Sequence, residues 1–359
     1  MKKIVTVVGA RPQFIKAAAV SRVIRKTGGI REVIIHTGQH FDDNMSTIFF
    51  QEMDIPLPHH HLEINSLSHG AMTGRMMEKI EAVLLQEKPD LVVVYGDTNS
   101  TLAGALAAKK LGISVAHVEA GLRSFNMKMP EEINRILTDR ISDLLFCPTE
   151  NAVLNLHQEG FGNYPCKIHR TGDVMYDAAL YYGNISGSRS RIIGNLGLSG
   201  KKFLLCTVHR QENTDNIENL REIFSALNEI HRETQVVLPL HPRTRKILNQ
   251  YKIKPAFEPV EPMGYFDIVE LLKHCGLVIT DSGGMQKEAF FFGKFCITLR
   301  EETEWIELVN NQFNILAGPH ASLIKKGYSG YMDKSVPKSV PLYGNGDASE
   351  KIIHIITNS

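Results

Sequence analysis

The sequence predicts an α/β fold of two doubly wound domains facing a central cleft, and three observations lead to this fold class. The chain has 359 residues, more than a single hydrophobic core usually organises. Short apolar runs alternate with amphipathic stretches, a pattern typical of a parallel sheet covered by helices on both faces. The alternation stops near the middle of the chain and then begins again, which indicates a second domain of the same kind.

The first series of strands predicts an N-terminal domain over residues 1–184. Its apolar runs lie at 4–8, 33–36, 91–95, 114–118 and 144–148, and a helical pattern follows each of them. The run before Gly9 is about five residues long, shorter than the apolar region of a usual signal peptide. We therefore interpret it as the first strand.

The second series predicts a C-terminal domain over residues 185–345. Its apolar runs lie at 203–208, 235–240, 276–281 and 295–299. The segment 184–202 between the two series is rich in glycine and serine, a composition typical of a linker. Residues 346–359 have a helical pattern, and we expect this helix to return to the N-terminal domain. Because ligands of open α/β sheets bind beyond the carboxyl ends of the strands, both sheet edges should line the cleft.

Charge and composition argue against several classes of function. The formal net charge of +1, from 40 basic and 39 acidic residues, argues against a broad surface for nucleic acid or for a membrane. No stretch approaches the roughly 20 apolar residues of a membrane span. The five cysteines form no CxxC pair, so the sequence indicates neither a disulfide framework nor a zinc site, and a reducing cytoplasm is expected. The histidine run at 59–61 lies in an expected loop and is predicted to be solvated.

The turn after the first strand carries two basic residues. Gly9 allows the turn, and Pro12 suits the first turn of a helix. Arg11 and Lys16 are then placed to meet an anion at the helix N-terminus. The alternative is an ordinary turn between a strand and a helix, with both basic side chains solvated.

Three acidic residues follow successive elements of the first domain. Asp97 comes after the run 91–95, Glu119 comes after the run 114–118, and Glu131 lies in the first turn of an expected helix. Arg135 lies one turn later on the same helix face. Asp97 could be only a helix cap and Glu131 only part of a surface ion pair. Together, the three carboxyl groups indicate an acid and base set for moving a proton bound to carbon.

In the second domain, two strand ends carry candidate residues. His209 closes the run 203–208, and a histidine followed by arginine at a strand end favours a functional role. Ser282, Gly283 and Gly284 follow the run 276–281 and open a helix, so their backbone N–H groups can face a diphosphate. Glu288, one turn later, is placed to accept hydrogen bonds from a ribose. A helix cap with a tight turn is the alternative interpretation.

With these residues in place, the chain resembles the family of non-hydrolysing UDP-N-acetylglucosamine 2-epimerases over almost its whole length. The motifs that carry the resemblance are GARPQFIK, TGQH, YGDTNSTLAG, HVEAGLRS, PEEINR, TDSGG and YGNGDAS. The family is similar in architecture to GT-B glycosyltransferases, with two Rossmann-like domains. The resemblance implies an enzyme that eliminates UDP from a UDP-2-acetamido sugar and adds it back with the opposite configuration at C2. It implies no metal, no cofactor, and a cytoplasmic homodimer.

Carried over residue by residue, the resemblance assigns catalytic roles to Asp97, Glu119, Glu131 and His209. It assigns substrate contacts to Arg11, Lys16, Gln39, His40, Arg135, Met263, Ser282, Gly283, Gly284, Lys287, Glu288 and Trp305. Gln39 and His40 match part of the region where some members bind a second, activating UDP-sugar. Asp42 replaces a neutral residue there, which argues against such regulation in this chain.

Two departures from the family pattern bear on the sugar. Many members read SGGxQEE and TERPE, whereas this chain has Lys287 within SGGMQKE and Trp305 within TEWIE. The chain most resembles the branch that converts UDP-2,3-diacetamido-2,3-dideoxyglucuronate to its manno epimer for surface polysaccharide, including O-antigen and other lipopolysaccharide. A uronate carboxylate would favour an added cation such as Lys287, although a side chain at this helix position could equally face solvent.

Three other functions remain open from the sequence. An ordinary UDP-N-acetylglucosamine 2-epimerase would share every catalytic motif and differ in sugar recognition. A GT-B glycosyltransferase would need an acceptor groove and would not need three carboxylates at one sheet edge. A UDP-sugar-binding regulator would have no reason to keep the carboxylate set.

Overall fold

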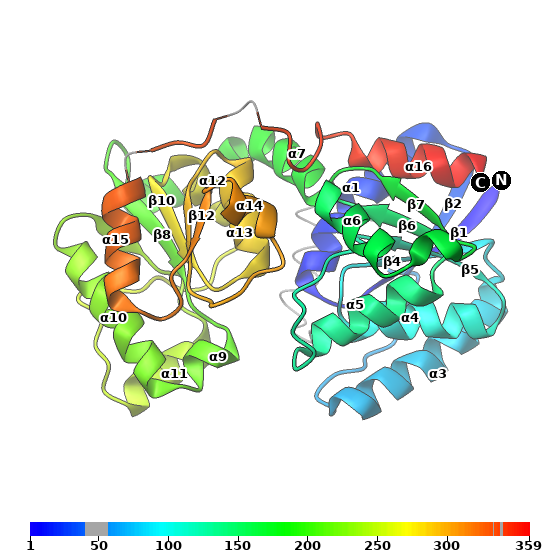
Figure 1. Cartoon of the computed structure of the whole chain (residues 1–359), viewed down its shortest axis with the longest axis horizontal. Coiled ribbons are helices and arrows are strands. Elements are labelled where there is room, and N and C mark those ends of the chain that lie inside the picture. Colours follow the sequence, from blue (N-terminus) through cyan, green and yellow to red (C-terminus); the bar gives the residue numbers. More distant parts are fainter. Residues whose placement is uncertain (40–56, 333, 338–339) are drawn as a thin grey trace. The chain divides into compact units, whose positions relative to one another are not determined.

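The computed structural model describes residues 1–39, 57–332, 334–337 and 340–359, and it divides the chain into two compact units. The N-unit comprises Met1–Ala178 and Pro341–Ser359, and the C-unit comprises Ala179–Val340. Each unit has a parallel sheet with helices around it (Figure 1). The predicted α/β fold class with two Rossmann-like domains is therefore confirmed.

Seven described strands form the parallel sheet of the N-unit, in the order β3-β2-β1-β4-β5-β6-β7. They are β1 (Lys2–Val8), β2 (Ile30–His36), β3 (His60–His61), β4 (Leu91–Tyr95), β5 (Ser114–Val118), β6 (Leu144–Cys147) and β7 (Lys167–Arg170). The central strand β4 is buried along its whole length because its residues are apolar on both faces. The chain reverses direction of winding between β1 and β4, and ligands of doubly wound sheets bind at such a point.

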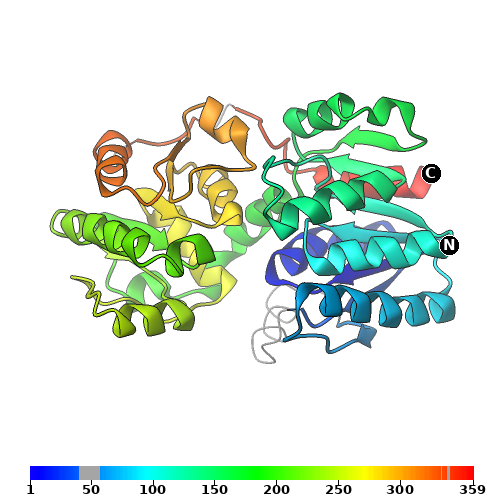
Figure 2. The ribbon, with the colours of Figure 1, turned by 60° about the horizontal axis from the view of Figure 1, so that its bottom comes forward.

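The helices of the N-unit connect these strands and cover the sheet (Figure 2). They are α1 (Arg11–Thr27), α3 (His69–Glu87), α4 (Asn99–Lys110), α5 (Pro130–Ile141), α6 (Glu150–Gln158), the short 3-10 helix η1 (Phe161–Asn163) and α16 (Ala348–Asn358). The helix α4 is almost wholly buried and packs closely on the sheet, since a Cβ added at Gly104 would lie 3.1 Å from Val94.

The C-terminal helix α16 belongs to the N-unit. It packs against α1, and both chain ends lie in this unit (Figure 1). The Lys2 ammonium donates to the carbonyl oxygen of Ile356 at 2.7 Å. The Asp177 carboxylate accepts the backbone N–H groups of Ala348 and Ser349, at 3.2 and 2.6 Å, which satisfies donors at the start of the helix.

Five described strands form the parallel sheet of the C-unit, in the order β12-β11-β10-β8-β9. They are β8 (Phe203–Thr207), β9 (Gln235–Val237), β10 (Leu277–Thr280), β11 (Cys296–Thr298) and β12 (Asn314–Leu316). The helices around them are α8 (Ile192–Asn195), α9 (Gln211–Thr214), α10 (Ile217–His231), α11 (Pro242–Gln250), α12 (Tyr265–His274), α13 (Gly283–Phe291), α14 (Ile306–Asn310) and α15 (Ala321–Tyr331). The carboxyl ends of β8 and β10 lie side by side.

The predicted linker over 184–202 is wrong in its first half, which is helical. The helix α7 (Val174–Arg189) continues through it, α8 follows, and the unit boundary at Ala178 lies inside α7. The small residues serve close packing, because a Cβ added at Gly183 would lie 3.0 Å from the Phe292 ring. Ser186 also donates to the Glu270 carboxylate on α12.

The histidine run is not wholly a loop, because His60 and His61 form the edge strand β3, but His59 and His61 are exposed to solvent as expected. His61 stacks on the buried ring of His36 with centroids 4.3 Å apart. Burial and the nearby His61 lower the pKa of His36 to about 4. Every helix in the described part of the chain is too short or too polar to cross a bilayer.

The Glu87 carboxylate at the end of α3 predicts a pH dependence of stability. It pairs with Lys3 at 2.6 Å and His60 at 2.8 Å, and these hydrogen bonds hold the pKa of Glu87 at about 2. The stabilisation is present above the unfolded-state pKa near 4.5 and is lost as the pH falls toward 2. Glu87→Gln should lower the melting temperature at about pH 7 by about 2–4 °C, equivalent to about 1 kcal/mol.

Calorimetry across the acid range tests this expectation. The gap between Glu87→Gln and the parent should close between pH 4.5 and 2. Glu78→Gln in the same helix is the control, because the Glu78 side chain is 68% exposed and its pairing with Arg75 contributes little. A gap of constant size at every pH would contradict the expectation.

Candidate active site

The carboxyl ends of the neighbouring strands β4 and β5 place two of the predicted carboxylates. Gly96 follows β4 with a φ of 64°, and Asp97 comes next. Glu119 directly follows β5 with a φ of 76°, a left-handed conformation that costs free energy for a residue with a side chain. Such strain is maintained where the surrounding structure requires it, and it is common in functional sites.

Lys16 reaches Glu119 from helix α1. Its ammonium forms an ion pair with the Glu119 carboxylate, and both side chains are 8% exposed. The turn at Gly96 lies against this pair, since a Cβ added there would be 3.0 Å from the Lys16 ammonium and 3.3 Å from the Glu119 oxygen. The structure thus brings together Lys16, Glu119 and the turn that leads to Asp97.

Arg135 connects Asp97 to a carboxylate that the sequence analysis missed. Its guanidinium donates to Asp97 at 2.6 Å and to Glu132 at 2.7 Å. Glu132 is fully buried and also accepts the backbone N–H groups of Ser124 and Phe125, at 3.0 and 2.8 Å. It therefore fixes the loop that leads from Glu119 to α5.

Glu131, the predicted catalytic residue beside Glu132, lies half-buried in the first turn of α5. The two adjacent glutamates thus differ in environment, because one points into the protein and the other has access to solvent. The spacing in the sequence does not indicate this difference. Glu132 and Glu131 lie three and four residues before Arg135, and both spacings suit an ion pair on a helix.

Gln39 lies at the same edge of the N-unit. Its side-chain oxygen accepts the backbone N–H of Ser100 at 3.0 Å and the Ser100 hydroxyl at 2.7 Å. Arg11 begins α1, but its side chain lies outside the described part of the structure, and His40 lies outside the described residues altogether. Their predicted substrate contacts stay predictions.

In the C-unit, Asp281 organises the loop that carries His209. Asp281 is fully buried at the end of β10 and accepts the backbone N–H groups of His209 and Arg210, at 2.9 and 3.0 Å. Its other oxygen lies 3.3 Å from Nδ1 of His209, whose ring is 46% exposed. The carboxylate therefore orients the His209 ring at the strand end. Burial and the charge of His209 lower the pKa of the neighbouring His241.

The N-terminus of α13 has the form expected of an anion site. The Ser282 hydroxyl caps the helix by accepting the Met285 N–H at 3.4 Å, and Gly283 and Gly284 form its first turn. Gly284 is exposed. A Cβ added at Gly283 would lie 2.3 Å from the Glu304 carboxylate, so only glycine leaves this turn undisturbed.

Lys287 and Trp305, which depart from the family pattern, contact each other. The Lys287 ammonium lies 3.9 Å from the centre of the Trp305 ring, a cation–π contact. The two residues are 1% and 3% exposed, so the alternative of a solvent-facing Lys287 is wrong. Gln286, next to Lys287, accepts the Thr303 hydroxyl at 2.8 Å and holds the same segment on α13. Glu288 is buried one residue further on.

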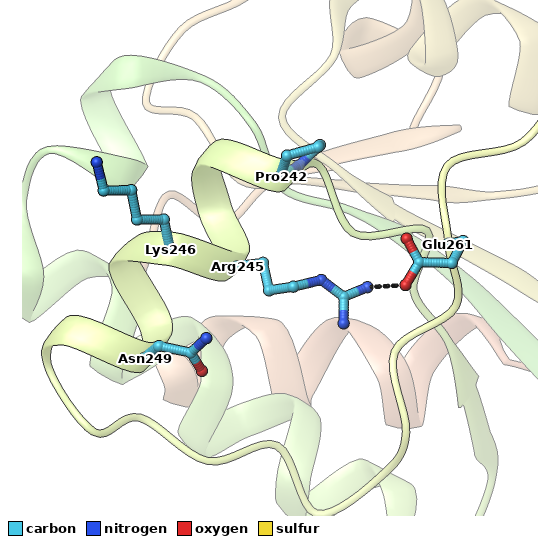
Figure 3. Close-up of a pocket in the computed structure, with 5 residues that line it drawn as sticks. All are labelled: Pro242, Arg245, Lys246, Asn249 and Glu261. Carbon is cyan, nitrogen blue, oxygen red and sulfur yellow. Dashed lines mark hydrogen bonds and ion pairs between the residues drawn. The ribbon is translucent and has the colours of Figure 1, made fainter.

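Met263 precedes α12 and packs against the core of the C-unit. Glu261, two residues before Met263, lines a pocket of about 500 Å³ beside α11 (Figure 3). An ion pair of 2.6 Å between Arg245 and Glu261 crosses this pocket. Pro242, Lys246 and Asn249 complete its lining, so it contains none of the predicted site residues.

Comparisons with known proteins find a family and relatives similar to this chain. The model of the UDP-N-acetylglucosamine 2-epimerase family matches residues 22–357. A Pseudomonas aeruginosa protein named UDP-2,3-diacetamido-2,3-dideoxy-D-glucuronate 2-epimerase is 52% identical over 98% of this chain and 98% of its own length.

Two solved structures are similar over the whole fold. The UDP-GlcNAc 2-epimerase of Methanocaldococcus jannaschii in complex with UDP-GlcNAc and UDP has a TM-score of 0.91 and 42% identity, covering 100% of both chains. The Neisseria meningitidis UDP-GlcNAc 2-epimerase bound to UDP-GlcNAc has a TM-score of 0.89 and 30% identity, covering 99% of this chain and 100% of that one.

The different environments of Glu131 and Glu132 predict different effects on stability. Glu132→Gln should cost about 3 kcal/mol, because a buried carboxylate with an arginine and two N–H partners loses its charge. Glu131→Gln should cost about 0.5 kcal/mol or less, the scale of a charge in the first turn of a helix. Urea unfolding measures both free energies, and equal losses would contradict the assignment.

Proposed function

Because the chain belongs to the family of non-hydrolysing UDP-N-acetylglucosamine 2-epimerases, we propose that it inverts C2 of UDP-2,3-diacetamido-2,3-dideoxyglucuronate. The product is the manno epimer. The observation that carries this choice is the 52% identity, over 98% of both chains, to the relative named for that substrate. In the elimination step, UDP and the C2 proton leave to give a 2-acetamido glycal, and in the readdition step UDP returns to C1 while C2 is protonated on the opposite face.

The N-unit supplies the proton-transfer groups. Asp97, Glu119 and Glu131 lie on successive elements of one sheet edge, and their surroundings differ. Glu119 is buried against Lys16, Asp97 is held by Arg135, and Glu131 has access to solvent. Carboxyl groups in different surroundings can hold different protonation states at one pH, which proton removal on one face of C2 and delivery on the other require.

The C-unit supplies the electrostatic stabilisation of the leaving diphosphate. The backbone N–H groups of Ser282, Gly283 and Gly284 lie at the positive end of α13, where a diphosphate is stabilised. His209, oriented by Asp281, provides a further donor to the phosphates or takes part in proton transfer. Glu288 is assigned to the ribose.

The charge near α13 supports a substrate with an extra carboxylate. Lys287 is held in the helix by the Trp305 ring and adds a positive charge one turn after the phosphate-binding glycines. A uronate sugar carries one more negative charge than N-acetylglucosamine. A cation at this position is therefore consistent with recognition of the extra carboxylate.

A second candidate function is that of a UDP-N-acetylglucosamine 2-epimerase, giving UDP-N-acetylmannosamine. It is supported by a Methanococcus maripaludis relative, 49% identical over 99% of both chains and named a homolog of that enzyme. It would use the same carboxylates and the same helix end. The two functions differ only in which sugar is accepted.

The setting of the reaction follows from the same family membership. We assign the enzyme to the synthesis of surface polysaccharide in the cytoplasm. Its five cysteines are free thiols, which suits a reducing compartment. We also propose a homodimer, as the family resemblance implies. Light scattering of the purified protein should then give twice the chain mass of 40.2 kDa.

Proton NMR in deuterium oxide tests the substrate. With UDP-2,3-diacetamido-2,3-dideoxyglucuronate, the manno isomer should appear with deuterium at C2, because the removed proton exchanges with solvent. Glu119→Gln, the control for the chemistry, should lower the rate by a factor on the order of 100. Conversion of UDP-N-acetylglucosamine in place of the uronate would establish the second candidate function.

Substitution of the two glycines tests the diphosphate site. Gly283→Ala should weaken UDP binding at least about tenfold, or about 1.4 kcal/mol, because its methyl group must displace Glu304. Gly284→Ala is the matched variant, since its methyl group would meet nothing closer than the Ser282 hydroxyl at 4.0 Å. Both alanines keep the N–H group. Titration calorimetry with UDP gives the affinities, and an equal loss in both variants would contradict the proposed geometry.

A further inference from the structure

A fully buried histidine lies two residues before Glu119 and has no role in the mechanism above. His117 belongs to β5 and is 0% exposed. Its Nδ1 lies 2.7 Å from the Asp139 carboxylate on α5, and its Nε2 lies 2.7 Å from the carbonyl oxygen of Gly96. Both ring nitrogens therefore face oxygen atoms.

The partners of His117 decide where its hydrogens are. The Gly96 carbonyl oxygen can only accept, so Nε2 must carry a hydrogen. Asp139 already accepts the Gly121 N–H at 3.1 Å and the Arg123 guanidinium at 2.7 Å. The ion pair between Arg123 and Asp139 is buried, with side chains 1% and 0% exposed, and a neutral carboxyl group would leave the guanidinium without this partner. Asp139 is thus a carboxylate, and Nδ1 must also donate.

The surrounding charges balance this buried cation. Arg123 also binds Glu159 through two hydrogen bonds, at 2.6 and 2.8 Å. These carboxylates raise the pKa of Arg123 against the effect of burial. The cluster therefore pairs two positive groups with two carboxylates. Cys147 on β6 lies close to Asp139, and burial together with that charge raises the pKa of its thiol.

The cluster holds the backbone on both sides of the predicted catalytic carboxylates. His117 binds the carbonyl oxygen of Gly96, next to Asp97, and Asp139 binds the N–H of Gly121, two residues after Glu119. Gly96, Glu119 and Gly121 all have left-handed backbone, with φ of 64°, 76° and 80°. The two glycines adopt this conformation freely, whereas Glu119 adopts it at a cost that its surroundings must offset.

We propose that His117 is a positioning residue that carries a hydrogen on both ring nitrogens, and that its bridge between Asp139 and Gly96 fixes Asp97 and Glu119 for proton transfer. The kinetic part of this inference rests on the proposed function, whereas the protonation state does not. The imidazolium acts through the backbone and touches no substrate atom. It differs in this from His209, whose ring is exposed.

Nitrogen NMR of the whole enzyme tests the protonation state. In a long-range proton–nitrogen spectrum of the ¹⁵N-labelled protein, both His117 nitrogens should have the shifts of N–H groups. The spectrum is recorded at about pH 7.5, where the two hydrogen bonds to oxygen atoms should keep a hydrogen on each nitrogen. One unprotonated His117 nitrogen at about pH 7.5 would overturn the proposal. His117→Asn, which removes the signals, provides their assignment.

Kinetics of variants tests the positioning role. Asp139→Asn should abolish the doubly protonated signature and lower kcat about 100-fold, the scale of a small misplacement of reacting groups, with a much smaller change in KM. Asp143→Asn is the control, because Asp143 binds the N–H of Val115 at the opposite end of β5. It should leave both the signature and kcat unchanged.

The outcomes separate the two proposals. If Asp139→Asn folds and keeps the parent kcat, the positioning role is wrong. If Asp139→Asn does not fold, His117→Asn provides the same kinetic comparison. If the parent enzyme epimerises neither sugar, the proposed function fails, while the nitrogen spectrum still decides whether His117 is doubly protonated.

Discussion

The left-handed backbone at the ends of β4 and β5 is the constraint on which the N-unit site depends. Gly96 and Gly121 meet it without steric cost, whereas Glu119 adopts it with a side chain and is strained. The left-handed conformation directs the Glu119 carboxylate toward Lys16 at the edge of the sheet. Interactions from α1 and α5 offset the strain, so the site depends on the packing of the whole unit.

The C-unit uses a buried carboxylate to the same end. Asp281 holds the loop after β8 through backbone N–H groups, as Glu132 holds the loop after β5. In both units, a buried acidic side chain accepts backbone N–H groups of the loop that follows a strand. The more accessible neighbours are the exposed His209, whose ring lies 3.3 Å from Asp281, and the half-buried Glu131, which precedes Glu132 in the chain.

The sequence predicted well the features that short local segments determine, such as buried strands and the residues at their ends. The apolar runs at 91–95 and 114–118 coincide with β4 and β5, and the rule on strand ends led to Asp97 and Glu119. The strands β3, β7 and β12 were missed because they are short or polar and have no apolar run. The pairing of Asp281 with His209 and that of Lys287 with Trp305 join segments far apart in the chain, and no local pattern shows them. The catalytic and binding roles themselves remain predictions.

The contact between Lys287 and Trp305 also has a consequence for the evolution of specificity. Lys287 and Trp305 are both buried and contact each other, so a substitution at one position changes which residues are tolerated at the other. If Lys287 and Trp305 contribute to sugar preference as proposed, that preference is inherited as a two-residue unit. Family members with only one of the two residues should be rare. A lysine at position 287 would otherwise be buried without an aromatic ring, or beside the arginine that many members have at position 305, and either arrangement destabilises the fold.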